Sequence, residues 1–102
     1  MLNNIQVLKA MPDYSNSMTR TAEAKLKPFE YPDECLAHND LVEKSPCNIG
    51  EGIIYHGQWS TDNKRNGKGI QIWLGGQKYE GMWVNNKRHG KGRCIYPNGD
   101  VC

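Results

Sequence analysis

Alternating apolar and polar positions in the second half of the chain predict β-strands. In KYEGMWV, Tyr79, Gly81 and Trp83 fall on one side of an extended strand, and the residues between them fall on the other side. The polar run NNKRH follows, and asparagine favours tight turns. GKGRCIY then resumes the alternation, with its even-numbered residues from Gly90 to Tyr96 on one face, and PNG adds a second turn. The pattern therefore predicts a β-hairpin.

The hairpin pattern occurs twice, as Tyr-x-Gly-x-Trp, then Gly-x-Gly, then one glycine before the next copy. The residues that carry it are Tyr55, Gly57, Trp59, Gly67, Gly69 and Gly76 in the first copy, and Tyr79, Gly81, Trp83, Gly90, Gly92 and Gly99 in the second. From Tyr55 to Tyr79 the shift is 24 residues, and from Gly67 to Gly90 it is 23. The extra residue lies between Trp59 and Gly67 and marks a loop, because loops absorb changes of length. A period of this size predicts a repeat architecture.

The repeat also predicts how the chain is divided. Two complete units span residues 53–76 and 77–99, and an incomplete half unit spans residues 45–52. Residues 100–102 begin a further unit, with Cys102 where an aromatic residue would stand. We expect the chain to be the front end of a longer array, because a solenoid normally ends on a finished capping unit. A divergent last unit is the alternative.

Residues 1–44 are predicted to form a separate N-terminal extension. All eleven glycines lie at or after Gly50, whereas four of the five prolines precede it. SMTRTAEAKLK contains good helix formers and predicts a short helix with Ser17 as its N-cap, and residues 31–44 predict a second one. Such short helices are marginal alone. We therefore expect a mostly irregular tail that orders only on the repeats or on a partner.

Stacked hairpins predict an all-β fold, an elongated single-layer antiparallel β-meander preceded by the irregular tail with one or two short helices. A glycine beside an aromatic residue leaves a groove in which the ring can lie over the bare backbone. We therefore expect one thin packed face without a second layer. Because about three repeats are usually needed for stability, we also expect more repeats or a partner that covers the sheet.

The stretches YHGQW…NGKGIQIWLGG and YEGMWVNNKRHGKGRCIYPNG resemble MORN repeats (membrane occupation and recognition nexus), and the resemblance covers about residues 45–102. It implies an elongated β-meander that works as a binding or assembly module. Related proteins serve as scaffolds in the cytoskeleton, in the ciliary axoneme and its radial spokes, and at membrane junctions. Some are joined to lipid kinases, and binding to acidic phospholipids has been proposed for the family. The chain departs from the family pattern after Trp59, in the first half unit and at Cys102.

Charge is unevenly distributed along the chain. Residues 1–50 hold five basic and seven acidic residues, a net charge of −2, and residues 51–102 hold eight and four, a net charge of +4. Lys64 and Arg65 recur as Lys87 and Arg88, and Lys68 recurs as Lys91. From these recurring positions, the candidate residues for anionic contacts are Lys64, Arg65, Lys87, Arg88 and Lys91. They would form a ridge for acidic phospholipid headgroups or an acidic protein, since each lysine near an anionic membrane contributes on the order of 1 kcal/mol. A solvated rim is the alternative. Nucleic-acid binding is not expected, because the excess charge is small and the aromatic residues are needed for packing.

No catalytic, cofactor or metal site is predicted. The glycine–lysine pairs fail the P-loop pattern, because the earlier glycine and the following Ser or Thr are missing. Cys35 and His38 would share a helix face, but no residue is placed to orient them. The four cysteines include no Cys-x-x-Cys pair, which argues against zinc, and without a secretory signal reduced thiols are expected. The sequence contains no run of about 18 apolar residues, so no transmembrane helix is predicted.

These observations favour a non-enzymatic scaffold over an enzyme. We expect the sheet and the tail to dock other proteins in a larger assembly, in the cytoplasm at the cytoskeleton or in the cilium and its axoneme. Two alternatives remain. One is a membrane adaptor whose basic loops bind acidic phospholipids, and the other is a regulatory segment of a larger enzyme.

Overall fold

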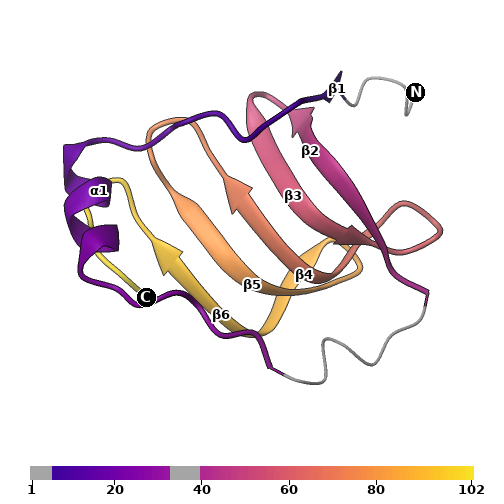
Figure 1. Ribbon diagram of the computed structural model, residues 1–102. Helices are drawn as coiled ribbons and strands as arrows, with labels where there is room; N and C mark the ends of the chain where they lie inside the picture. The colour runs from indigo at the N-terminus through magenta and orange to yellow at the C-terminus, as the bar shows by residue number, and fades with distance from the viewer. Residues whose placement is uncertain (1–5, 33–39) are drawn as a thin grey trace.

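The computed structural model describes residues 6–32 and 40–102, which form one open antiparallel sheet and a short helix (Figure 1). The strands are β1 (Gln6–Val7), β2 (Val42–Gly50), β3 (Ile53–Trp59), β4 (Arg65–Ile72), β5 (Lys78–Val84) and β6 (Lys87–Ile95). They follow one another across the sheet in sequence order. The predicted all-β antiparallel meander is confirmed, and its two predicted hairpins are β3–β4 and β5–β6.

Helix α1 spans Ser17–Ala24 and begins with Asn16 as its N-cap. The Asn16 side-chain oxygen accepts a hydrogen bond from the Thr19 backbone N–H at 2.9 Å, and the Thr19 hydroxyl oxygen accepts one from the Asn16 N–H at 2.9 Å. This capping box satisfies two amides at the start of the helix. The prediction of Ser17 as the N-cap is wrong by one residue. Three residues after Ser17 stands Arg20, which has no acceptor and cannot complete such a box.

Much of the second predicted helix falls on residues 33–39, which lie outside the described residues. The prediction is wrong for the last residues of this helix, because residues 42–44 begin strand β2. Val42 pairs with Trp59 in the β2–β3 ladder, and the Lys44 ammonium lies 5.4 Å from the Trp59 ring centroid. These long-range contacts outweigh a local helix propensity of a few tenths of a kilocalorie per residue.

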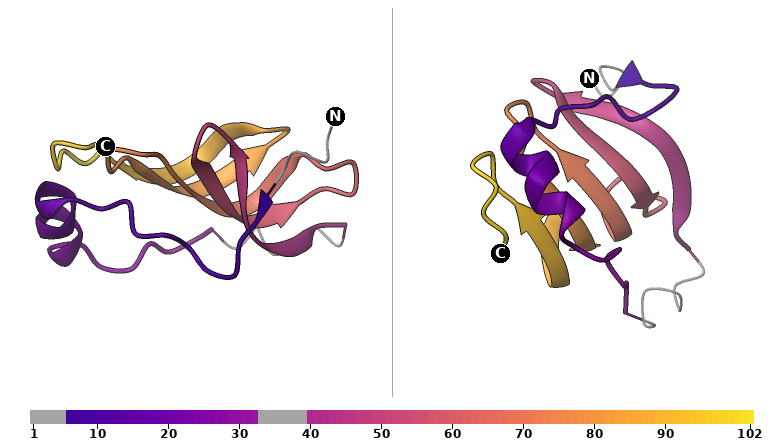
Figure 2. Two further views of the ribbon diagram at one scale, coloured as in Figure 1. Left: turned by 90° about the horizontal axis from the view of Figure 1, so that it is seen from above. Right: turned by 60° about the vertical axis from the view of Figure 1, so that its left-hand side comes forward.

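The N-terminal extension lies across one face of the sheet. The chain crosses this face between β1 and α1, and the residues after α1 run back on the same side (Figure 2). The face carries Ile54, Ile72 and Ile95, which are 2%, 8% and 2% exposed. Fully burying such a side chain contributes about 1.5–3 kcal/mol. The sheet is a single layer, and the tail covers this face, which agrees with the expectation that the tail orders on the repeats or on a partner.

Asn16 fixes the start of α1 to two successive repeats at once. Its side-chain amide donates to Gly75 O at 3.1 Å and to Pro97 O at 3.0 Å, in the turns that follow β4 and β6. Glycines make room for the helix there. A Cβ at Gly76 would lie 2.8 Å from the Asn16 amide nitrogen, and one at Gly99 would lie 3.0 Å from the backbone of the helix. The turn glycines of the repeat signature therefore also serve the docking of the tail.

The opposite face is packed by the aromatic residues of the two repeats. Trp59, Tyr55, Trp83 and Tyr79 form a continuous series of edge-to-face contacts, with successive centroid distances of 5.1, 5.4 and 5.3 Å. Ring quadrupoles favour this arrangement. The four side chains are between 0% and 6% exposed, so they form the core of this face.

Signature glycines make room for the tyrosine rings. A Cβ at Gly92 would lie 2.5 Å from Tyr79 Cε1, and a Cβ at Gly69 would lie 2.5 Å from Tyr55 Cε1. Each tyrosine therefore lies over the bare backbone of the next strand, as predicted. Pairing across the sheet aligns the glycines in one row: Gly57, Gly69, Gly81 and Gly92.

Each repeat contains a β-bulge that the sequence analysis missed. In β4, two extra residues lie between the partner of Gly57 and the partner of Trp59, and β6 shows the same irregularity. Gly67 and Gly90 lie within these bulges with φ of +87° and +70°, which glycine adopts readily. A shift of two residues keeps each side chain on its face but brings the arginine near the start of each strand opposite a tryptophan. Arg65 pairs with Trp59, and Arg88 pairs with Trp83.

Cys94 and Cys102 form a disulfide, with their Cα atoms 5.2 Å apart. The expectation of reduced thiols is wrong for this pair. Cys102 follows Gly99 by three residues, as Tyr79 follows Gly76, so it takes the place of the repeat tyrosine. Its N–H donates to Cys94 O at 2.9 Å. Cys47 is buried and free, and burial raises the pKa of its thiol. Cys35 lies outside the described residues.

Candidate functional site

Strand β6 forms an open edge of the sheet. It is the last strand in the order β1 to β6, and its residues 87–91 are exposed. In the described part of the chain, its outer side is paired only near its far end, by the Ile95–Val101 bridge and the hydrogen bond from Cys102 to Cys94. An edge of unpaired amides and carbonyls is a template on which another strand can pair.

Four of the five predicted anionic-contact residues are exposed at this edge or near it. Lys87, Arg88 and Lys91 lie on β6, and Lys64 lies in the turn before β4. The β3–β4 and β5–β6 turns lie at the same end of the sheet, because β3 and β5 run in the same direction (Figure 1). The fold thus gathers these cations at one end and one edge of the molecule. That they bind anions stays a prediction.

Arg65, the fifth candidate, is half-buried and makes structural contacts. Its guanidinium lies 4.9 Å from the Trp83 ring centroid and donates to Asn86 O at 3.0 Å. The same guanidinium donates to the side-chain oxygen of the buried Gln71. Burial lowers the pKa of Arg65 from its usual value. Because these groups belong to both hairpins, Arg65 joins the two repeats and has few donors left for an external anion.

Arg88 occupies the position of Arg65 in the second repeat but has different neighbours. Its guanidinium lies 5.4 Å from the Tyr79 ring centroid, and the position of Gln71 is taken by Cys94. Within residues 6–32 and 40–102, no acceptor bonds to this guanidinium. Beside it opens a hollow of about 230 Å³, whose lining includes Tyr79, Arg88 and Cys94. An exposed cation beside an aromatic hollow is suited to binding an aromatic or acidic group of a partner.

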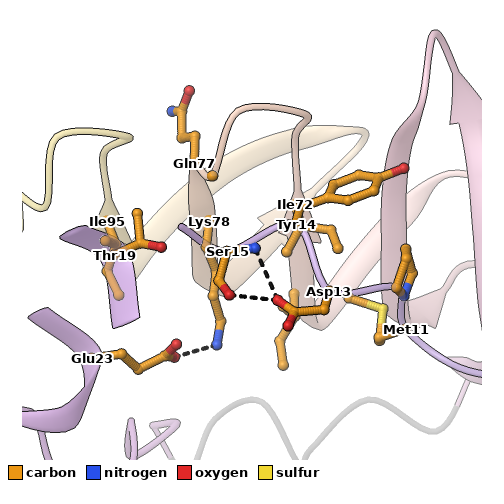
Figure 3. A pocket seen from close by; sticks show the side chains of 13 residues that line it. Met11, Asp13, Tyr14, Ser15, Thr19, Glu23, Ile72, Gln77, Lys78 and Ile95 are labelled. Atoms are coloured by element: carbon orange, nitrogen blue, oxygen red, sulfur yellow. Dashed lines mark hydrogen bonds and ion pairs between the residues drawn. The ribbon is translucent and has the colours of Figure 1, made fainter. Parts of the chain in front are cut away.

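A second hollow, of about 210 Å³, lies between the tail and the covered face of the sheet (Figure 3). Ile70, Ile72 and Ile95 form much of its apolar lining. At its rim Asp13 accepts hydrogen bonds from the Ser15 hydroxyl and N–H, which lower the pKa of that carboxyl, and Glu23 pairs with Lys78. The described lining residues include neither histidine nor cysteine. Of its charged groups, Glu23 is paired with Lys78, and Asp13 is held by Ser15.

The described residues hold no group of three or more His, Cys, Asp or Glu side chains arranged to bind a metal ion. No helix in the same part of the chain is long and apolar enough to cross a membrane. The Cys35 and His38 pair considered from the sequence lies outside the described residues.

The open meander, its row of glycines and its interlocked Tyr and Trp rings define a protein built from stacked two-stranded β-repeats. Residues 55–78 and 79–101 match the family model of the MORN repeat. The chain therefore contains two MORN repeats, and the resemblance seen in the sequence is confirmed. MORN repeats are non-enzymatic modules that generally mediate interactions with proteins or membrane lipids. Neither a curated protein nor a solved structure shows significant similarity to the chain.

Sequence reasoning found the repeat signature but missed the residues that dock the tail. The Asn-x-x-Thr spacing before α1 is a local signal that identifies Asn16 as the cap. Nothing local signals the ion pair between Glu23 and Lys78, which are 55 residues apart in sequence. The bulge in each repeat has a signal in the sequence, the Gly-x-Gly itself, but that pattern also fits an undisturbed strand.

Proposed function

We propose that the chain is a non-enzymatic scaffold that docks other proteins in a larger assembly, in the cytoplasm at the cytoskeleton or in the cilium and its axoneme. The observation that carries this proposal is the open edge of β6, where residues 87–91 are exposed and their outer backbone groups are free to pair. The nature of MORN repeats as interaction modules supports docking. The cellular location is proposed because related scaffolds act at the cytoskeleton and in the cilium.

A tagged chain expressed at native level in ciliated cells tests the proposal. We expect it to migrate in native extract as a particle much larger than the monomer, and to colocalise with axonemal or cytoskeletal markers. An edge variant, Arg88→Glu with Lys91→Glu, should migrate at the size of the monomer, because its acidic side chains repel acidic partners from β6. The matched control is Lys25→Glu with Lys27→Glu in the exposed tail, which makes the same change in charge. A chain that is monomeric in native extract contradicts the scaffold role, and a diffuse signal contradicts the location.

A second function, binding to acidic phospholipids, is favoured by the exposure of Lys64, Lys87, Arg88 and Lys91 at one end and edge of the sheet. Exposed cations near an anionic surface contribute on the order of 1 kcal/mol each. Four of them would give measurable binding at low salt that weakens as salt screens the charges.

Liposome co-sedimentation distinguishes this function from the scaffold role. We expect binding to vesicles with anionic lipid and none to neutral vesicles. Reversing Lys64, Lys87 and Lys91 to Glu should abolish it. Reversing three tail lysines, Lys9, Lys25 and Lys27, is the matched control, because the net charge changes equally. Equal losses in both triple variants would mean that only net charge matters, and the repeat surface would then not be a lipid site.

A further inference from the structure

We propose that the Cys94–Cys102 disulfide is a redox switch for the tail: oxidation favours helix α1 docked on the sheet, and reduction loosens it. The disulfide closes a ring of residues 94–102, and the turn inside this ring is one of the two turns to which Asn16 is bound. This regulation is separate from the scaffold role, because it acts on the tail and not on the edge of β6.

The two cysteines occupy a pair of positions that recurs along the repeats. In the β4–β5 ladder, Gln71 lies opposite Tyr79. A shift of 23 residues places Cys94 and Cys102 at the same two positions, on either side of the next turn. Their Cα atoms are 5.2 Å apart, within the usual range for a disulfide. The register of the repeat itself therefore brings the two thiols together.

The ring that the disulfide closes contains a tight turn. The Tyr96 N–H donates to Asp100 O at 2.8 Å, and the Gly99 N–H donates to Tyr96 O at 2.8 Å. Gly99 has a φ of +91°, so the turn has a defined and unusual backbone conformation. Closing a ring with a covalent bond removes open conformations of the residues inside it. Oxidation therefore favours the folded turn over its open forms.

Helix α1 begins against this same turn, and the two lie side by side in both views of Figure 2. The Asn16 amide donates to Pro97 O at 3.0 Å, and a Cβ at Gly99 would lie 3.0 Å from the backbone oxygen of Met18. Asn16 also donates to Gly75 O at 3.1 Å, in the preceding turn, which contains no cysteine. Opening the turn at residues 96–100 therefore removes one of the two turns that anchor the start of the helix.

The chemistry of the switch is thiol–disulfide exchange at the exposed cysteine. Cys102 is exposed and Cys94 is 2% exposed, so an attacking thiolate reaches the sulfur of Cys102. Glutathione, whose thiol and disulfide forms set the redox poise of the cytosol, supplies both the reductant and the oxidant. Its thiolate bonds to the Cys102 sulfur, and the Cys94 sulfur leaves and takes up a proton. A second glutathione attacks this mixed disulfide and releases Cys102 as a thiol. Two glutathiones are thereby oxidised to one glutathione disulfide, which drives the reverse reaction.

The disulfide and the docked tail stabilise each other through the turn that they share. Because the disulfide favours the folded turn and the turn holds α1, oxidation favours the docked tail. Linkage requires the reverse as well, so a docked tail favours the disulfide by the same factor. We expect a factor of about ten, which is typical of coupling between two sites. Reduction then exposes Ile54, Ile72 and Ile95 more often, because the tail covers them.

A glutathione titration of the full chain measures the coupling at the disulfide. The readout is the fraction of Cys94–Cys102 disulfide, obtained by alkylation and peptide mapping with mass spectrometry. Asn16→Asp keeps the capping oxygen but loses both amide hydrogen bonds to the turns, so its disulfide should be reduced about tenfold more readily, a shift of about 30 mV. The control is Glu23→Gln, which weakens the contact of the tail with Lys78 and leaves the turn unchanged. Its redox equilibrium should stay within about twofold of the unsubstituted chain.

Amide hydrogen exchange measures the same coupling at the tail. The Arg20 N–H donates to Asn16 O in the first turn of α1, so its exchange reports on opening of the helix. Reduction should speed this exchange about tenfold in the unsubstituted chain and less than about twofold in Asn16→Asp. Cys102→Ser, a change at an exposed position, should exchange like the reduced chain in both oxidising and reducing buffer.

Three results would overturn the switch. An unshifted redox equilibrium in Asn16→Asp would show that the turn does not connect the tail to the disulfide. Equal acceleration of exchange in both chains would mean that reduction only destabilises the fold as a whole. Peptide mapping that joins Cys102 to a cysteine other than Cys94 would remove the ring around the turn. The scaffold role stands in each case, because it rests on the edge of β6.

Discussion

Replacing Gly92 with alanine would place a methyl group where the ring of Tyr79 lies. The added Cβ would be 2.5 Å from Tyr79 Cε1 and nearer still to Cζ and the hydroxyl oxygen, so the ring must move. Tyr79 is 6% exposed and its hydroxyl donates to Met82 O at 3.1 Å. Moving the ring therefore breaks packing and a hydrogen bond together.

The expected cost follows from two opposing effects. Overpacking a well-packed site costs about 1–3 kcal/mol, and the upper end applies here because three atoms of the tyrosine side chain are too close. Alanine restricts the unfolded chain more than glycine does and returns about 0.5–1 kcal/mol. The net loss in the free energy of unfolding should be about 2 kcal/mol, a large share of the roughly 5–15 kcal/mol typical of a domain. Urea unfolding followed by tryptophan fluorescence measures it.

A double-mutant cycle with Tyr79→Leu isolates the cause. Leucine lacks Cε1, Cζ and the hydroxyl, the atoms that a Cβ at Gly92 would meet. In that background Gly92→Ala should be neutral or stabilising by up to about 1 kcal/mol. An equal cost of Gly92→Ala in both backgrounds would refute the view that the glycine exists to make room for the ring. The first repeat offers an internal replicate, since Gly69 has the same relation to Tyr55.

Three further predictions concern the tail. Asn16→Ala removes the N-cap and the amide that bridges two turns, so it should lower the free energy of unfolding in urea by about 2 kcal/mol. Asn16→Asp keeps a capping oxygen and should cost less. Equal costs for the two variants would exclude the capping role. Glu23→Gln should cost less than about 1 kcal/mol, because its ion pair with Lys78 is partly exposed; a cost of several kilocalories would contradict this. Burial, and secondarily the charge of Glu80, raises the pKa of Tyr31 to about 12. The folded chain therefore holds this proton more tightly than the unfolded chain, and the resulting stabilisation is present below about pH 10 and lost as the pH rises toward 12. Relative to its own stability at pH 7, Tyr31→Phe should lose less free energy of unfolding above about pH 10 than the unsubstituted chain; parallel curves would show that Tyr31 is not the group responsible.

The repeats could be predicted from sequence because their contacts are local. Alternation fixes which side chains share a face, and the polar run between two such stretches fixes a hairpin. The ring of Tyr79 meets Gly92 only thirteen residues away, across one turn, so the purpose of the glycine is already implied by the pattern. The strands of the two repeats, β3 to β6, their order and the ring-over-glycine packing therefore follow from sequence alone.

The candidate site was only partly predictable. The recurrence of basic residues identified Lys64, Lys87, Arg88 and Lys91, which are exposed, but treated Arg65 as their equal. The β-bulge brings both arginines opposite a tryptophan on the aromatic face, but their surroundings differ. There Arg65 meets acceptors of the next hairpin, whereas Arg88 faces a hollow. Identical residues in identical motifs thus differ in role, since one lies inside the sheet and the other at its edge.

The sequence by itself determined the repeating unit, whereas the tertiary structure alone decided what lies on the sheet. Glu23 and Lys78 pair across 55 residues, and Asn16 reaches Pro97 across 81. Periodicity cannot foresee such contacts, because it describes neighbours along the chain and not the surface on which a distant segment settles. The tail covers the isoleucine face because burial of Ile54, Ile72 and Ile95 outweighs the entropy lost in ordering it, and that balance exists only once the strands are assembled.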